Sequence, residues 1–392
     1  MSLIFLLFSC LGFISLISTS PIIERGEALA ILSPRDSSRS RIASRDTSIN
    51  FGEIGATFIL GSAESRVSDS GTYPRLARLS DGGVLGISTF KDGNDKVLRV
   101  SRSDNDGGSF SLISEVARGP GDIDNGFLLQ LPSGAILAAF RNHDLNANGA
   151  ATYYRITICR SDDGGRTWSF VVQAAEHAAS GVNGMWEPFM RIGKDGGIQL
   201  TWSEELSQNN QETFRAVSHD EGKTWTSPVN LRLHSTSQQF RDGMQGIVSI
   251  RDTNGQDVLV MVFECKDGAN FYLGTVTSTD DGNTWGNRNT IYRPSQHNAG
   301  APQIASLGNN LAVVFMTDED TAAGSLAWPG KADIKMIFGT QPSNAQVTWT
   351  SQTMHLSDDP SYWPGTFQRA SNNIMAVYER GGIPYGKVIT KG

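Results

Sequence analysis

Ser161-Asp-Asp-Gly-Gly-Arg-Thr-Trp168 is one copy of a pattern, Ser-x-Asp-x-Gly-x-Thr-Trp, that recurs through the chain and decides its architecture. Three other segments match it closely: Ser103-Asp-Asn-Asp-Gly-Gly-Ser-Phe110, Ser218-His-Asp-Glu-Gly-Lys-Thr-Trp225 and Ser278-Thr-Asp-Asp-Gly-Asn-Thr-Trp285. Successive copies begin 58, 57 and 60 residues apart. Such regular spacing indicates a structural repeat.

Each copy follows a strand-like run and precedes another, so we interpret it as a hairpin turn. The preceding runs are Val97 to Val100, Ile156 to Cys159, Phe214 to Val217 and Leu273 to Thr277. In such a turn the Asp or Asn side chain bonds backbone amides, Gly permits positive φ, and we expect the aromatic residue to pack under the next repeat. We assign these turns a structural role and no catalytic one.

The pattern resembles the Asp-box (BNR) repeat proteins, and the resemblance covers nearly the whole chain after residue 48. A repeat of this length without helical periodicity implies four-stranded antiparallel blades around an axis. Six units align by their first strands, which begin Tyr73-Pro-Arg-Leu, Asp124-Asn-Gly-Phe, Trp186-Glu-Pro-Phe, Met244-Gln-Gly-Ile, Ala301-Pro-Gln-Ile and Trp363-Pro-Gly-Thr.

The fold class predicted for residues 48–392 is therefore an all-β, six-bladed β-propeller of the sialidase-like kind. The sixth unit ends at Gly392 with too few strands. We expect the segment from Ile49 to Leu60 to supply its outer strand, so that the N-terminal strand closes the ring.

Composition excludes some partners. The 392 residues carry a net charge of −7, which argues against nucleic acid because its binding needs a basic surface. We expect no membrane partner and a monomer. No metal-ligand cluster is evident among the 6 histidines, and nothing demands a cofactor or a metal.

The N-terminus predicts a secreted, extracellular protein. Residues 3 to 17 are apolar but too short for a membrane span, so we interpret 1–20 as a signal peptide and 21–47 as a flexible or processed leader. Cys10 would leave with the signal. For Cys159 and Cys265 we favour two buried thiols, although a disulfide between them stays open.

Propeller topology predicts where function lies. The start of the first strand and the end of the second share one rim in every blade, and the repeated turns lie on the opposite face. The rim collects carboxylates, amides and aromatic rings, as a sugar site requires. These residues are Arg75, Asp124, Asn125, Arg141, Asn142, His143, Trp186, Glu187, Glu204, Glu205, Gln245, Glu264, Asp318, Trp363 and Glu379.

Two of these glutamates are the candidate catalytic pair. Glu187 and Glu264 are each flanked by bulky apolar residues, in Met185-Trp-Glu-Pro-Phe and Val262-Phe-Glu-Cys, which should desolvate them. Hydrolysis of a glycosidic bond usually needs one ionised carboxyl and one with a raised pKa. Arg141 and Glu379 occupy strand-two positions equivalent to Glu264 and are the next candidates for substrate contacts.

At these residues the sequence resembles the fungal exo-1,5-α-L-arabinanases of glycoside hydrolase family 93. The motifs are Trp186-Glu-Pro-Phe, Phe263-Glu, Phe140-Arg-Asn-His and Tyr73-Pro-Arg-Leu. The resemblance implies a retaining enzyme that releases arabinobiose from plant cell-wall arabinan, with Glu264 as nucleophile and Glu187 as general acid/base. It also implies that Tyr362 lies near the nucleophile.

Alternatives stay open. Glu204 or Glu205 could take the acid/base position in place of Glu187. A sialidase shares the fold but uses a tyrosine nucleophile and three arginines; Arg75 and Arg141 would supply two of them. A non-catalytic glycan-binding propeller is the third reading, against which the paired rim glutamates count.

Overall fold

A computed structural model describes residues 46–322 and 328–392. These residues belong to one compact unit, Ser44–Gly392. The predicted signal peptide and all but the last two residues of the predicted leader lie outside the described residues. Among the described residues, every regular element is a β-strand, and no helix is long and apolar enough to cross a membrane.

The strands form antiparallel units, each named here by its first strand. The β3 unit contains β3 (Thr72–Arg78), β4 (Val84–Asp92), β5 (Asp95–Ser103) and β6 (Ser111–Gly119). The β7 unit contains β7 (Asp122–Gln130), β8 (Ile136–Leu145), β9 (Ala151–Ser161) and β10 (Ser169–Ala178). The β11 unit contains β11 (Met185–Ile192), β12 (Ile198–Ser207), β13 (Asn210–Ser218) and β14 (Val229–Asn230).

The next units follow the same order along the chain. The β15 unit contains β15 (Arg241–Arg251), β16 (Asp257–Lys266), β17 (Phe271–Ser278) and β18 (Gly286–Tyr292). The β19 unit contains β19 (Ala299–Leu307), β20 (Asn310–Thr317), β21 (Asp333–Gly339) and β22 (Met354–Ser357). The β23 unit contains β23 (Ser361–Ala370), β24 (Asn373–Arg380) and β25 (Ile383–Lys391), joined by β2 (Ala56–Arg66) and β1 (Thr47–Phe51).

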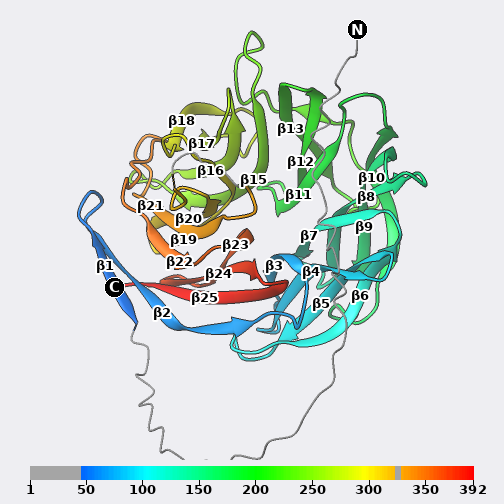
Figure 1. Ribbon diagram of the computed structural model, residues 1–392, viewed down its shortest axis with the longest axis horizontal. Helices are drawn as coiled ribbons and strands as arrows, with labels where there is room; N and C mark the ends of the chain where they lie inside the picture. The colour runs from blue at the N-terminus through cyan, green and yellow to red at the C-terminus, as the bar shows by residue number, and fades with distance from the viewer. Residues whose placement is uncertain (1–45, 323–327) are drawn as a thin grey trace, which may run out of the picture. The chain divides into compact units, whose positions relative to one another are not determined.

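The sheets do not close on themselves, but neighbouring first strands contact each other in order. β3 contacts β7, and contacts then follow from β7 to β11, β15, β19 and β23, with β23 contacting β3. In Figure 1 these first strands lie toward the middle of the view, with β2, β6 and β10 at its margin. The β11 and β15 units share one sheet through the parallel pair Gln211–Arg241.

The N-terminal strand that joins the C-terminal sheet has different bounds from the predicted segment. β2, spanning Ala56–Arg66, pairs antiparallel with β25, whereas the predicted segment ran from Ile49 to Leu60. The residues Thr47–Phe51 form β1, which pairs with β2 as an additional outer strand. A turn at residues 52–55 separates the two strands, and the prediction merged them.

A bulge recurs in the first strand of each unit. Pairing with the second strand slips at this point, and one residue there has a φ of 50° to 55°: Tyr73, Asn125, Glu187, Met244, Ala301 and Trp363. Sequence alignment had placed Asp124 and Trp186 at this position. The structure places the following residues, Asn125 and Glu187, there. Non-glycine residues are uncommon in this conformation, which occurs in turns and at functional sites.

The four repeat turns (103–110, 161–168, 218–225 and 278–285) adopt the predicted structure. In the third, Ser218 Oγ donates to Asp220 Oδ1 at 2.8 Å, and Asp220 accepts from Thr224 N at 2.9 Å and Thr224 Oγ1 at 2.6 Å. Asn105 takes the aspartate's place in the first turn. Ser218 pairs with Ile198 at the start of β12, so this turn lies at the far end of the unit from Glu204.

The aromatic residues of these turns pack toward the preceding unit, not the next one as predicted. Phe110 contacts the hydrophobic cluster of Phe367, Met375 and Val377 in the β23 unit. The indole Nε1 of Trp168 donates to Ser114 Oγ in β6 at 3.1 Å. The turns therefore reach back to stabilise the contact between units.

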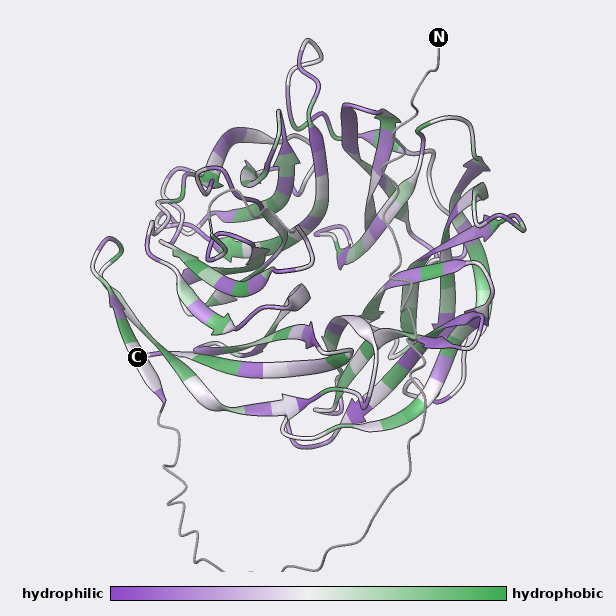
Figure 2. Cartoon of the chain, viewed as in Figure 1, coloured by the Kyte–Doolittle hydropathy of each residue, from purple (hydrophilic) through white to green (hydrophobic). Residues whose placement is uncertain are grey.

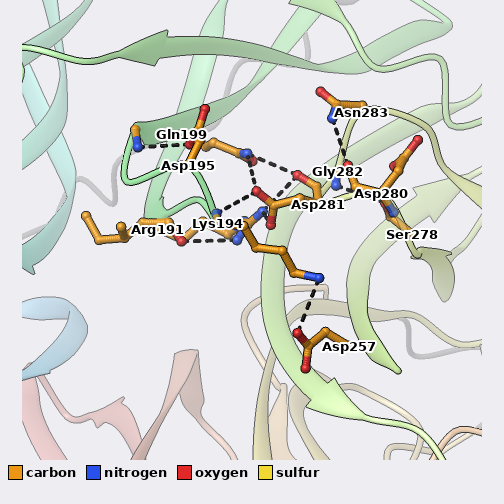
Figure 3. Close-up of polar contacts among 12 residues, drawn as sticks. Arg191, Lys194, Asp195, Gln199, Asp257, Ser278, Asp280, Asp281, Gly282 and Asn283 are labelled. Carbon is orange, nitrogen blue, oxygen red and sulfur yellow. Dashed lines mark hydrogen bonds and ion pairs between the residues drawn. The ribbon is translucent and has the colours of Figure 1, made fainter. Parts of the chain in front are cut away.

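Acidic residues of the repeat turns add ion pairs to these contacts (Figure 3). Asp281 pairs with Arg191 and accepts a hydrogen bond from the Lys194 amide at 2.8 Å. The Gln199 amide donates to the Asp281 carbonyl at 3.0 Å. Glu221 pairs in the same way with Arg160 of the β7 unit at 2.9 Å.

The hydrophobic core lies between neighbouring units. One cluster joins Leu137 and Ile158 of the β7 unit to Leu200 and Trp202 of the β11 unit. Figure 2 shows both hydrophobic and hydrophilic segments along the strands. Cys159 and Cys265 are buried free thiols, so the favoured interpretation is confirmed and they form no disulfide.

Candidate functional site

The bulges gather side chains at one end of the units. Opposite the residue before each bulge lies a second-strand residue: Thr89, Arg141, Ser203, Glu264, Met316 or Glu379. These side chains contact the bulge of the following unit. Thr89 Oγ1 donates to Asp124 at 2.6 Å, and Ala301 N donates to Glu264 at 2.8 Å. Glu379 and Thr72 make the same kind of contact between the last unit and the first.

Glu187 lies on the bulge of β11. Its Oε2 accepts a hydrogen bond from Met244 N, on the bulge of β15, at 3.3 Å. Burial, followed by the negative charge of Glu264, raises the pKa of Glu187 to about 7, while Arg141 and the donors Ser203 and Met244 N oppose the rise. The side chain can therefore hold a proton near neutral pH and give it up.

Glu264 lies near the end of β16. Burial raises its pKa, but the Ala301 N–H and the charge of Arg241 favour its ionised form. The backbone approaches this carboxylate at Gly300, where a Cβ atom would stand 2.7 Å from Glu264 Oε2. A side chain at position 300 would therefore displace the carboxylate.

Register brings the two glutamates together. Glu264 pairs across the sheet with Gly243, and the next residue, Met244, donates its amide to Glu187. Directly opposite residues on antiparallel strands have Cα atoms about 4.5 to 5.5 Å apart. The charge of Glu264 is accordingly felt at Glu187. The predicted pair thus shares one site.

Arg141 organises the side of the site next to Glu187. Its guanidinium pairs with Asp122 at 3.1 Å and Asp124 at 3.2 Å and donates to Asn125 Oδ1 at 3.0 Å. Its charged end lies over the Trp186 ring, 5.1 Å from the ring centre. Positive and negative charges here are largely matched.

His143 supports Trp186 from behind. It is 1% exposed, and its ring contacts the rings of Tyr154 and Trp186 edge-on. Burial and the charge of Arg141 lower its pKa to about 4, so it is neutral at pH 7. Its role is packing. Asn142 precedes His143 on β8, is half-buried and pairs with Ile123 on β7.

Arg75 and Tyr73 form a buried pair below the first bulge. Arg75 is 5% exposed, stacks on the Tyr73 ring and donates to the carbonyls of Pro74 at 2.8 Å and Trp363 at 3.2 Å. Burial lowers the pKa of Arg75, whereas Tyr73 and the charges of Glu187 and Asp124 favour its charged form. Arg75 therefore lies close enough to the acidic centre for these charges to act on it.

The predicted contacts on the β23 unit lie beside one another. Tyr362 pairs across the strand with Glu379, and Trp363 follows at the bulge. Glu379 accepts the Gly382 amide at 2.6 Å, and burial raises its pKa. The Tyr362 hydroxyl donates to the Gly330 carbonyl at 3.2 Å. Glu379 therefore occupies the position in the β23 unit that Glu264 occupies in the β15 unit.

Gln245 supports the site from beneath rather than lining it. It is 1% exposed, accepts a bond from Ser203 Oγ at 2.9 Å and donates to the Glu187 carbonyl at 2.9 Å. Its side-chain amide is thus committed within the protein, and the predicted substrate contact does not fit its geometry.

The alternative carboxylates have other partners. Glu204 accepts a hydrogen bond from the Trp202 indole at 2.9 Å. Glu205 pairs with Arg241 at 2.6 Å and accepts the Gly184 amide at 3.1 Å. Asp318 accepts the Asn298 amide at 2.6 Å. Glu204, Glu205 and Asp318 are therefore each held by contacts that do not involve Glu264.

Two residues at the site were missed by sequence reasoning. Ser203 lies opposite Trp186 and accepts the Met244 amide at 3.3 Å. Trp328 contacts Gly300 next to Glu264, although it lies between β20 and β21. A signal for Trp328 existed, because Trp328-Pro-Gly repeats the tripeptide Trp363-Pro-Gly of the β23 bulge.

One group of potential metal ligands also escaped notice. Ligand atoms of Asp320, Asp333 and His355 lie within 4.8 Å of one another. However, the Lys335 ammonium is 2.8 Å from Asp320 and 4.0 Å from Asp333. A cation is already supplied by the protein there, and we assign no metal to this group.

Comparisons with known proteins reveal similar folds. No protein-family model and no curated protein sequence matches the chain. An α-L-arabinanase from Penicillium chrysogenum, solved with arabinobiose, is 18% identical with a TM-score of 0.61, and the match covers 88% of this chain and 98% of that one. A family GH93 α-L-arabinofuranosidase from Fusarium graminearum, also solved with arabinobiose, is 17% identical with a TM-score of 0.62, covering 82% and 93%.

Sialidases are also similar. A sialidase from Streptococcus pneumoniae is 13% identical with a TM-score of 0.54, covering 82% of this chain and 69% of that one. At such identities the likeness establishes the fold. The chain has the all-β fold of the GH93 arabinanases and the propeller sialidases.

Proposed function

We propose that this protein is a secreted, retaining glycoside hydrolase that acts from the chain end of α-1,5-L-arabinan and releases arabinobiose. Glu264 is its nucleophile and Glu187 its general acid/base. One observation carries the proposal. The two glutamates are held by bulge amides at one site, and the pKa of Glu187 is raised to about 7 by burial and by Glu264.

The proposal includes a six-bladed propeller with the site on its axis. Support comes from the cyclic order of contacts between first strands, in which β23 meets β3. The packing of Phe110 against Met375 and Val377 joins the same two units on the opposite face. Pairing of β2 with β25 supplies the outer strand that the last blade would otherwise lack.

The mechanism takes two displacements. Ionised Glu264 attacks the anomeric carbon, and the bond to the leaving oxygen breaks as that oxygen takes the Glu187 proton. Glu187, now ionised, removes a proton from water, whose oxygen attacks the same carbon and releases Glu264. A pKa near 7 suits Glu187 for both steps, because the group must first give up a proton as an acid and then take one as a base.

A neutral sugar fits the charges around the pair. The guanidinium of Arg141 is matched by Asp122 and Asp124, and that of Arg241 by Glu205. Arg75 is buried and donates through one guanidinium nitrogen, Nη1, to backbone carbonyls. The commitments of Arg141 and Arg241 disfavour the sialidase alternative, which needs arginines for a substrate carboxylate. Two similar structures hold arabinobiose, which is uncharged.

The non-catalytic alternative is disfavoured by the electrostatic cost of the pair. When two buried carboxyls lie so close that one raises the pKa of the other, they destabilise the fold. Their presence therefore favours a function that needs both groups. A glycan-binding protein needs only hydrogen bonds and flat apolar surfaces.

Incubation of the purified protein with linear α-1,5-L-arabinan, followed by product identification, tests the proposal. We expect arabinobiose from the first minutes, and a rate that falls as the pH rises through about 7, because Glu187 then loses its proton. Release of sialic acid from a sialoside would favour the sialidase alternative. Binding of arabinan without turnover would favour the non-catalytic one.

A further inference from the structure

Trp328 lies at the nucleophile, although it comes from the connection between β20 and β21. A Cβ atom on Gly300 would stand 3.0 Å from Trp328 Cζ2 and 2.7 Å from Glu264 Oε2. These two atoms are therefore no farther apart than the sum of the two distances. The absence of a side chain at Gly300 lets the indole and the carboxylate approach each other.

The indole is held in place by its neighbours. It packs against the core cluster that includes Tyr73, Met244 and Ala301, and its ring lies 6.2 Å from that of Phe271. Two residues later, the Gly330 carbonyl accepts the Tyr362 hydroxyl at 3.2 Å. Trp328 stays partly exposed. A fixed, partly exposed aromatic ring is a surface on which the apolar face of a sugar can stack.

The two glutamates have different flanks. Glu264 shares Gly300 with Trp328, whereas Arg141, which lies over Trp186, acts on the pKa of Glu187. Trp186 itself directly precedes Glu187 on β11. In a retaining glycosidase the acid/base is next to the leaving group, and the nucleophile lies beneath the sugar that it attacks. The Trp328 flank thus corresponds to the transferred sugar, and the Trp186 flank to the leaving group.

We propose that Trp328, with Phe271 beside it, forms a stacking platform for the transferred part of the substrate, the part released as product. The ligand class is a neutral furanoside, and the assignment rests on the proposed hydrolase function. The platform accounts for recognition of the glycone, while Trp186 recognises the leaving group.

The loops before β17 and after β18 offer room for a longer glycone. They form a hollow of about 350 Å³ lined by Asp267, Asn270, Arg293, Ser295 and Gln296, and Asn270 directly precedes Phe271. Arg293 pairs with Asp267 and stacks on Tyr272. These polar groups suit the hydroxyls of a second sugar, so a two-sugar product fits this side.

The experiment compares Trp328→Ala with Trp186→Ala on substrates that share one glycone and differ in the leaving group. The two substrates are nitrophenyl α-L-arabinobioside and arabinotriose. Both carry arabinobiose as the glycone, with nitrophenol or arabinose as the leaving group, and kcat/KM is measured for each. For Trp328→Ala we expect the same loss on both, about ten-fold, which corresponds to about 1.4 kcal/mol for one stacked ring. For Trp186→Ala we expect the larger loss on arabinotriose, whose leaving group is a sugar.

Trp328→Phe separates stacking from folding. It keeps an aromatic ring against Gly300 and should recover most of the lost kcat/KM, while thermal melting of both Trp328 variants reports the fold. A loss for Trp328→Ala confined to arabinotriose would move the platform to the leaving-group side and overturn the proposal. If wild type is active and Trp328→Ala has the same kcat/KM as wild type on both substrates, the platform is overturned and the proposed function stands. A wild type inactive on arabinan would overturn the function, and this assignment with it.

Discussion

The two faces of the units use the same chemical group in opposite ways. In the repeat turns, each aspartate accepts hydrogen bonds from a threonine hydroxyl and from backbone amides, and these bonds lower the pKa of Asp220 to about 2. At the bulges, Glu187 is buried with few donors and faces a second carboxylate, and its pKa rises to about 7.

The difference lies in what surrounds the carboxyl group. A carboxylate with several donors is stable when ionised and tightens a turn. A buried carboxyl beside another negative charge resists ionisation and can carry a proton at neutral pH. The turns therefore stabilise the fold, whereas the bulges carry a reactive site at some cost to it.

The largest effect is expected from Glu264→Gln. The variant lacks the nucleophile and should show no detectable turnover of arabinan, at a melting temperature no lower than that of wild type, because one of two repelling buried carboxyls is neutralised. Glu379→Gln is the matched control, because Glu379 occupies the equivalent strand position. It should retain measurable turnover with a raised KM. An equal loss of turnover in both variants would mean that removing any carboxylate at this strand position impairs the enzyme, and that Glu264 has no special role as nucleophile.

Glu187→Ala should act selectively. Loss of a general acid usually costs about 10²- to 10⁴-fold, so kcat on arabino-oligosaccharides should fall by that range. An activated nitrophenyl leaving group needs no proton, and the first step should be nearly intact with it. The check is a comparison of kcat/KM on both substrates. A uniform loss would remove Glu187 from the acid role and turn attention to Glu204 and Glu205.

On the opposite face, Trp225→Ala should damage stability alone. Trp225 packs against the cluster that joins the β7 and β11 units, so its removal should cost about 3 to 5 kcal/mol of unfolding free energy. The kcat of the folded fraction should stay near that of wild type. Phe170→Ala is the control, since Phe170 is 62% exposed and its loss should cost little. A stable but inactive Trp225→Ala would contradict the separation of the two faces.

The smallest expected effect is on the stability of the fold at acid pH. Because the pKa of Asp220 is lowered to about 2 in the fold, its stabilising effect is present above the unfolded value of 3.8 and is lost as the pH falls from there through 2. Asp220→Asn should weaken this acid dependence, seen in melting temperatures at pH 2 to 5. Asn105→Asp, in the first turn, should strengthen it. Two variants with the same acid dependence as wild type would show that these carboxylates do not set it.

Much of this arrangement is legible in the sequence, because the repeat turns recur at fixed spacing and so locate the strands between them. The same spacing put Glu187 and Glu264 on one rim, and the structure brings the two side chains close together. The bulge could not be predicted from the sequence, because it shifts the pairing of the first two strands by one residue and has no composition signal at Asn125 or Glu187. Gln245 was misassigned because alternation along a strand does not reveal which polar group is consumed by a neighbouring backbone.

Contacts made by loops were also beyond prediction. Trp328 and Glu264 both adjoin Gly300, which leaves room for them, and such proximity depends on tertiary packing. The direction in which Phe110 and Trp168 pack likewise depends on how adjacent units face each other. Local patterns fix turns and strands, but contacts between units require the assembled fold.

The most direct test of the catalytic pair is the anomeric configuration of the first product from α-1,5-L-arabinan, followed by proton NMR before mutarotation. Two displacements at one carbon restore the original configuration, so the account predicts that the α-anomer appears first. An initial β-anomer would mean single displacement by water, and would contradict the assignment of Glu264 as nucleophile.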